Sequence, residues 1–258
     1  MSGEVMVFTN NPFAAVTELF SPLAMQIYIV LMVVAVVLGT LLDVYHKGSG
    51  IFFAQRKAKS KAAAERQLSD GEAFSLALET VAEAAVSGEF CKWPRRLSHL
   101  LMMYGFFVYI ITTVVLVFCY PGARSVPAIL PGLWAVGAWM ILAGGLWFFF
   151  FLRVNVAFDG DSPFHLGRAD LFVVSLIASV AFALLWSHVQ TTYVNPTATW
   201  TLFGLYMFST TILFGAVRWS KFAHMFFKPA VAFQRRVEEA NGSSDLPRPS
   251  NENYIVRS

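Results

Sequence analysis

Five long runs without Asp, Glu, Lys or Arg dominate this 258-residue chain. About 20 helical residues at ~1.5 Å each cross a ~30 Å hydrocarbon core, and each run is close to that length or longer. The sequence therefore predicts an all-α, polytopic membrane protein with five transmembrane helices in a bundle. The runs cover residues 23–42, 97–120, 129–152, 171–189 and 200–217.

The composition supports the membrane class. Hydrophobic residues make up 57% of the chain and charged residues 14%, and the mean hydropathy is +0.58. These values lie outside the usual range of soluble domains.

The basic residues predict the orientation. With the N-terminus outside, the inner segments 44–96, 153–170 and 218–258 hold 18 of the 19 Lys and Arg residues, and Arg124 falls outside. Cytoplasmic loops carry such an excess, so we expect an outer N-terminus and a cytoplasmic C-terminus. This basic inner face accounts for the net charge of +3 without a nucleic-acid partner.

The predicted organisation has an extracytoplasmic N-terminal segment, 1–22, and a transmembrane domain, 23–228. The chain is also expected to have a cytoplasmic connector, 44–96, and a C-terminal cytoplasmic arm, 229–258, that has no core of its own. The first run follows about twenty residues without Lys or Arg and is too long for a signal peptide, so we expect it to be retained. The expected spans are about 23–43, 97–120, 129–152, 171–190 and 199–227, the last one ending at Pro229.

The connector contains a stretch with helical periodicity at 72–86. Its apolar residues recur at spacings of four, three and four, so the pattern predicts an amphipathic helix at the membrane surface or against a partner. A solvated connector is the alternative. The apolar positions are Phe74, Leu78, Val81 and Ala85, and the charged ones Glu72, Glu79 and Glu83.

The two cysteines are placed on opposite sides of the predicted membrane. Cys91 precedes the second span and Cys119 ends it, about 40 Å apart along a helix. They cannot pair, and two separate thiols cannot hold an iron–sulfur cluster or a structural zinc.

His99 and His224 are candidate axial ligands of a haem iron. His99 lies four residues after Arg95 in the second span, and His224 four residues before Lys228 at the predicted end of the fifth. Both are therefore expected about one turn below the cytoplasmic interface, on separate helices, as a bis-histidine haem b requires. The alternative is that each histidine is an interfacial polar side chain.

Basic residues near both histidines are candidate partners of haem propionates. The ordinary alternative is that they anchor cytoplasmic helix ends. These residues are Arg95, Arg96, Arg218 and Lys221. His188, near the outer end of the fourth span, is a candidate hydrogen-bond donor to a quinone, with a structural role as the alternative.

Two stretches carry a family resemblance. "RRLSHLLMMYGF" and "GAVRWSKFAHMFFKP" resemble the cytochrome b membrane subunits of the respiratory nitrate reductase gamma-subunit type. "FQRRVEEANGSSDLP" and "FDGDSPFHLGRAD" are similar to narrower members. These are the membrane anchor of dissimilatory adenylylsulfate reductase and the membrane part of the quinone-interacting membrane-bound oxidoreductase complex.

The resemblance implies a haem b anchor in a bacterial or archaeal cytoplasmic membrane. It would dock a cytoplasmic iron–sulfur flavoprotein, adenylylsulfate reductase, and pass electrons between that enzyme and the quinone pool in sulfur metabolism. The chain would then be an electron-transfer subunit rather than a stand-alone enzyme. Two-haem relatives carry a second histidine pair, which corresponds to Tyr109 and Tyr206 here, so a single haem is expected.

Two other functions stay open. A redox-inactive anchor for the same enzyme is the main alternative. A transporter has less support, because the five apolar runs hold no charged residues and the sequence shows no pair of broken helices in matching halves.

Overall fold

The computed structural model describes residues 10–18, 20–88, 90, 92–153, 164, 166–193, 195–219 and 224–245. These residues are helical or lie in turns and loops, and no strand occurs among them. The chain divides into two compact units. Unit 1 comprises Met1–Asp43 with Val86–Ala223, and unit 2 comprises Val44–Ala85 with His224–Ser258.

Within the described residues, four helices are long and apolar enough to span a membrane. This confirms the all-helical, multi-pass membrane class. The helices are α1 (Pro22–Lys47), α4 (Trp93–Phe118), α5 with the π-helical turn η2 (Ile129–Trp147 and Phe148–Leu152) and α7 (Leu171–Thr192).

The expected fifth span, 199–227, is wrong as a single helix. α8 covers Pro196–Gly215, and turns follow through Trp219. Asn195 caps its start by accepting a hydrogen bond from the Ala198 N–H at 3.1 Å. Apolar residues continue beyond Gly215, and hydropathy alone does not show where a helix ends. The prediction therefore extended the fifth span too far.

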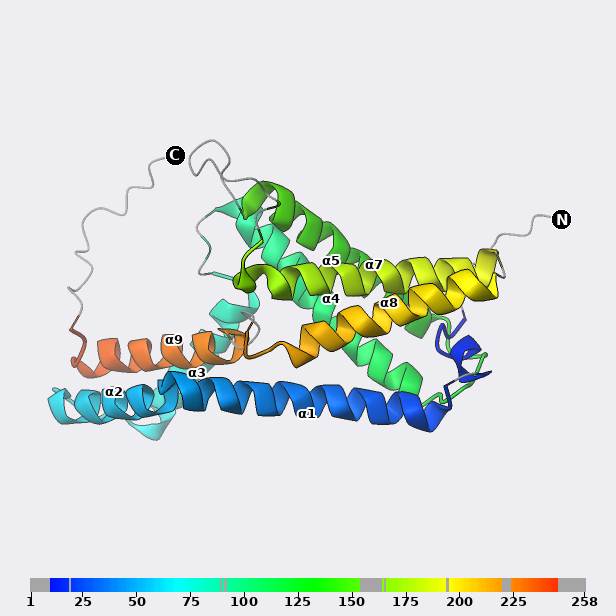
Figure 1. Ribbon diagram of the computed structural model, residues 1–258. Coiled ribbons are helices and arrows are strands. Elements are labelled where there is room, and N and C mark those ends of the chain that lie inside the picture. Colours follow the sequence, from blue (N-terminus) through cyan, green and yellow to red (C-terminus); the bar gives the residue numbers. More distant parts are fainter. Residues whose placement is uncertain are drawn as a thin grey trace. The chain divides into compact units, whose positions relative to one another are not determined.

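Glycines allow the helices of unit 1 to approach closely. A Cβ at Gly137 of α5 would lie 2.7 Å from the Tyr109 nitrogen of α4, and one at Gly105 would lie 2.8 Å from the Gly137 oxygen. Such small-residue contacts are typical of helix pairs in membranes. Figure 1 shows α4, α5, α7 and α8 of this unit beside one another.

Polar contacts attach α1 to its neighbours in unit 1. The Tyr28 hydroxyl donates to the Met207 carbonyl of α8 at 3.1 Å, and the Gln26 amide donates to the Val117 carbonyl of α4 at 3.2 Å. Most of α1 is nevertheless exposed, including Val30, Val33 and Val37. An exposed apolar surface on a helix of this length fits contact with lipid.

The segment before α1 folds into unit 1. The Asn11 side chain donates to the carbonyls of Tyr120 and Ala123, in the loop between α4 and α5. Phe13 is buried between Trp134 and Trp186, at ring distances of 6.0 and 5.5 Å. The segment ends in the 3-10 helix η1 (Ala15–Glu18).

Unit 2 is built from α2 (Ser49–Ala63), α3 (Asp70–Ala85) and α9 (His224–Asn241). A capping box starts α3: Glu72 N–H donates to the Ser69 hydroxyl, and Ser69 N–H donates to the Glu72 carboxylate. α3 confirms the helix that the periodicity at 72–86 predicted.

The expectation of an extended arm from residue 229, with Pro229 as a helix stop, is wrong. Pro229 lies inside α9, which continues to Asn241. As the sixth residue of α9 it removes one bond from the backbone ladder without ending the helix. Contacts from α2 and α3 hold the helix: Arg56 forms two hydrogen bonds with the buried Glu238, at 2.8 and 2.6 Å.

Candidate functional site

His99 lies in the second turn of α4, with its imidazole held in place by the preceding loop. Its Nδ1 lies 2.8 Å from the Ser87 hydroxyl, and the Phe90 ring lies 5.0 Å from the imidazole. Metal-binding histidines use one ring nitrogen for the metal while the other is oriented by a hydrogen bond. A serine hydroxyl can donate or accept, and in the tautomer in which Nδ1 donates to Ser87 the lone pair is on Nε2.

The loop after α3 adopts a strained backbone conformation at the residue that contacts His99. Ser87 is buried and has φ of 51°, in the left-handed region that non-glycine residues rarely adopt. The Val86 carbonyl accepts a hydrogen bond from Arg96 Nε at 2.8 Å, which fixes the loop to the first turn of α4. Ser87 was missed by the sequence analysis, and the Ser-Gly pair that follows the predicted helix was the available turn signal.

Both candidate propionate partners on α4 have backbone acceptors in the structure. Arg95 donates to the Leu152 carbonyl at 3.0 Å, and Arg96 donates to the Val86 carbonyl. An arginine has five N–H donors, so one such bond leaves donors for an anion. A role for either residue toward haem stays a prediction.

His224 is placed differently from the sequence expectation. It begins α9 in unit 2, whereas His99 belongs to unit 1. The continuous fifth helix on which the matched depth was based does not exist, because α8 ends at Gly215. The His224 side chain and Lys221 lie outside the described parts of the chain, and Arg218 is exposed in the turn after α8. The pairing of His99 with His224 stays a prediction.

The other described histidines have aromatic neighbours. The half-buried His188 lies near the C-terminal end of α7 with its ring 5.8 Å from Tyr193, and the exposed His46 lies 5.7 Å from Tyr45. His165 lies outside the described residues. The suggested quinone contact of His188 stays a prediction.

Aromatic rings fill the region around Tyr109 and Tyr206. Tyr109 and Tyr206 are both buried, and the Tyr109 hydroxyl has no hydrogen-bond partner among the described residues. Trp186 stacks on Tyr206 with an angle of 12° between the rings, and Trp134 lies 5.4 Å from Tyr109. The side chains here form a packed core.

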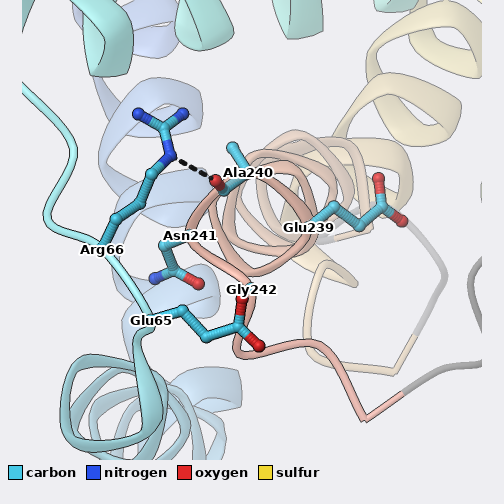
Figure 2. Close-up of a pocket in the computed structure, with 6 residues that line it drawn as sticks. All are labelled: Glu65, Arg66, Glu239, Ala240, Asn241 and Gly242. Atoms are coloured by element: carbon cyan, nitrogen blue, oxygen red, sulfur yellow. Dashed lines mark hydrogen bonds between the residues drawn. The ribbon is translucent and has the colours of Figure 1, made fainter.

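Unit 2 has an open hollow of about 520 Å³ at the end of α9. Figure 2 shows Arg66 donating to the Ala240 carbonyl at 3.0 Å, and the Glu65 N–H donates to the Asn241 carbonyl at 2.9 Å. These bonds satisfy the last carbonyls of the helix, so the hollow is a helix-end junction. Its lining residues are Glu65, Arg66, Glu239, Ala240, Asn241 and Gly242.

The part of the chain that the structure describes has no group of three or more His, Cys, Asp or Glu residues able to hold a metal ion. Two axial histidines of a haem would not form such a group. The exposed Cys119 is a free thiol.

Comparison of the chain with protein-family models, with curated proteins and with solved structures finds no match.

Proposed function

We propose that this protein is a haem b membrane anchor that docks a cytoplasmic iron–sulfur flavoprotein and exchanges electrons with membrane quinone. The resemblance noted in the sequence makes adenylylsulfate reductase the partner and a bacterial or archaeal cytoplasmic membrane the location. When bound, haem supplies one-electron transfer. The observation that carries the proposal is the contact between Ser87 and His99 Nδ1, at 2.8 Å.

A buried hydroxyl at this position supports iron ligation by His99 in two ways. It restrains the ring plane of the imidazole, and it can accept a hydrogen bond from Nδ1, which would select the tautomer in which Nε2 carries the lone pair. Phe90 packs against the same ring and restricts its rotation. His224 is the proposed second ligand on the basis of the sequence resemblance.

The proposed topology has five spans, with α8 as the fifth. α8 has 20 residues and no charged side chain, and its buried Thr210 lies 3.0 Å from Ser179 of α7. Such hydroxyl contacts are common between membrane helices. This topology places the N-terminus outside and unit 2 in the cytoplasm, as the basic residues predict.

Unit 2 is the proposed docking platform for the soluble enzyme. α2 carries Arg56, Lys57, Lys59 and Lys61 and no acidic residue. α3 carries acidic residues and no basic one. Segregated charge of this kind favours oriented association with a charged partner.

A single haem is proposed, because the buried rings of Trp134 and Trp186 occupy the core beside Tyr109 and Tyr206. Neither tyrosine offers the neutral imidazole nitrogen that a bis-histidine haem takes from each axial residue.

The test is a dithionite-reduced minus air-oxidised absorbance spectrum of the purified chain, with the haem-to-protein ratio. We expect one low-spin b-type haem per chain. His99→Ala and His224→Ala should each abolish the signal, whereas His46→Ala and His165→Ala should leave it intact. A normal spectrum in His224→Ala would refute the pairing.

A redox-inactive anchor is the second candidate. The backbone acceptors of Arg95 and Arg96 favour it, because these bonds give both guanidinium groups a structural role without any ligand. Folded protein that contains no haem after expression with adequate haem supply, but still binds the reductase, would establish this alternative.

A further inference from the structure

The two faces of α3 differ in what they contact. Arg236 of α9 forms ion pairs with Glu79 at 3.0 Å and with Glu83. Thr80, on the same side of α3, is buried. The side of α3 that packs within unit 2 carries Thr80 and the half-buried Leu76, and the ion-paired glutamates flank it.

The apolar face of α3 points away from these contacts. Phe74, Leu78 and Val81 fall within an arc of about 60° at 3.6 residues per turn. They are 68%, 55% and 63% exposed. An amphipathic helix in water normally buries such a stripe against its own core. Unit 2 instead packs against a different side of the helix, so the stripe requires an apolar environment from elsewhere.

The chain connects this stripe to a membrane-spanning helix. α3 ends at Ala85, and the carbonyl of the next residue, Val86, accepts the hydrogen bond from Arg96 in the first turn of α4. Trp93, the first residue of α4, is 64% exposed, and exposed tryptophans are enriched at membrane interfaces. The last residue of α3 is thus joined covalently to a residue that is fixed to the first turn of α4.

From these contacts we infer that α3 lies in the membrane–water interface with Phe74, Leu78 and Val81 buried in the lipid. The helix carries Asp70, Glu72, Glu79 and Glu83 and no basic residue, so anionic headgroups do not attract it. Insertion of the apolar stripe drives the association, and a bilayer of neutral phosphatidylcholine is sufficient. This inference does not depend on haem.

The test uses the full chain in phosphatidylcholine vesicles, with Cys91→Ser and Cys119→Ser as background. A nitroxide spin label is attached at Leu78→Cys, and its accessibility to oxygen and to a water-soluble nickel chelate is measured. Ser75→Cys is the matched control, since Ser75 is exposed on the same helix about a quarter turn from the stripe.

We expect the label at position 78 to lie ~5–10 Å below the headgroup level, more accessible to oxygen than to the chelate. The label at 75 should show the reverse preference. Val81→Cys provides a second report from the stripe if Leu78→Cys folds poorly.

Equal accessibility of positions 78 and 75 to the chelate would overturn the inference. A stripe that is accessible to water in these vesicles but becomes protected on addition of the reductase would be a protein-docking surface and would equally overturn it. Strong dipolar coupling between labels on two chains would assign the stripe to self-association. The haem spectrum of the same samples is read separately, so failure of the haem proposal does not affect this result.

Discussion

The hydroxyl of Ser87 lies 2.8 Å from Nδ1 of His99, across the junction between the loop after α3 and the second turn of α4. Ser87 is buried and adopts a left-handed backbone conformation to make this contact. A strained backbone conformation costs free energy and persists where the surrounding structure or a function requires it. The relationship therefore singles out His99 among the histidines whose side chains the structure describes.

Ser87→Gly removes the hydroxyl while accepting the positive φ. If His99 binds haem iron, loss of this orienting partner should weaken haem binding by about 10- to 100-fold. Haem titration of the apoprotein measures the change. Ser175→Ala is the control, because Ser175 is buried but bonds to carbonyls of its own helix, α7. Unchanged haem affinity in Ser87→Gly would argue against ligation by His99.

Gly137→Ala should destabilise unit 1, because its Cβ would lie 2.7 Å from the Tyr109 backbone nitrogen. Overpacking of this kind costs about 1–3 kcal/mol. The matched control is Gly132→Ala in the same helix, where nothing lies within 4 Å of the added Cβ. We expect the control to be neutral or slightly stabilising. Unfolding of the detergent-solubilised protein by sodium dodecyl sulfate, followed by circular dichroism, compares the two variants.

Phe13→Ala should destabilise unit 1, because Phe13 is only 4% exposed and packs against two tryptophans. Removing a buried phenylalanine typically costs about 3–5 kcal/mol. Phe20→Ala, at a position that is 38% exposed, should cost less. Thermal unfolding monitored by tryptophan fluorescence measures both. Equal losses would mean that Phe13 does not insert between the tryptophans.

The contact between α9 and α2 should weaken in acid. Hydrogen bonds from Arg56 and Gln234 lower the pKa of the Glu238 carboxyl below its ordinary value. A carboxyl with a depressed folded-state pKa contributes stability above its unfolded pKa of ~4.3 and loses it as the pH falls through the folded value. Amide exchange in α9, corrected for intrinsic rates, should therefore accelerate below about pH 4.3.

The variant Glu238→Gln isolates this effect. Its α9 should exchange faster than wild type near neutral pH and should show a weaker acceleration in acid. An identical pH profile in the variant and the wild type would assign the acid response to other carboxyls, such as Glu72. Hydrogen bonds from Arg66 and Ser69 lower the pKa of Glu72 to about 2.

Much of the fold follows from local sequence patterns. Uncharged runs of about 20 residues allow little besides membrane-spanning helices, since backbone polar groups in lipid must be satisfied within the helix. The run at 129–152 became α5 with η2 at the same bounds, and the spacing of Phe74, Leu78 and Val81 became α3. Both predictions depend on periodicity and length, which are properties of the sequence itself.

The end of the fifth run depended on tertiary structure. Apolar residues continue from α8 toward His224, and nothing in their hydropathy marks Gly215 as the last helical residue. The charged side chains of α9 (His224–Asn241) have partners far away in sequence, Arg236 with Glu79 and Glu238 with Arg56. A one-dimensional pattern contains no information about such pairs.

The candidate site also combines a residue that the sequence predicted with one that only the structure revealed. His99 was evident from sequence because an imidazole in an apolar run is costly and therefore stands out. Ser87 was not, because its importance arises from a left-handed turn that brings a hydroxyl back to a residue twelve positions later. The sequence by itself determined the membrane class and the candidate ligand. Tertiary contacts decided what orients that ligand, because hydrogen bonds depend on distances that only the folded chain sets.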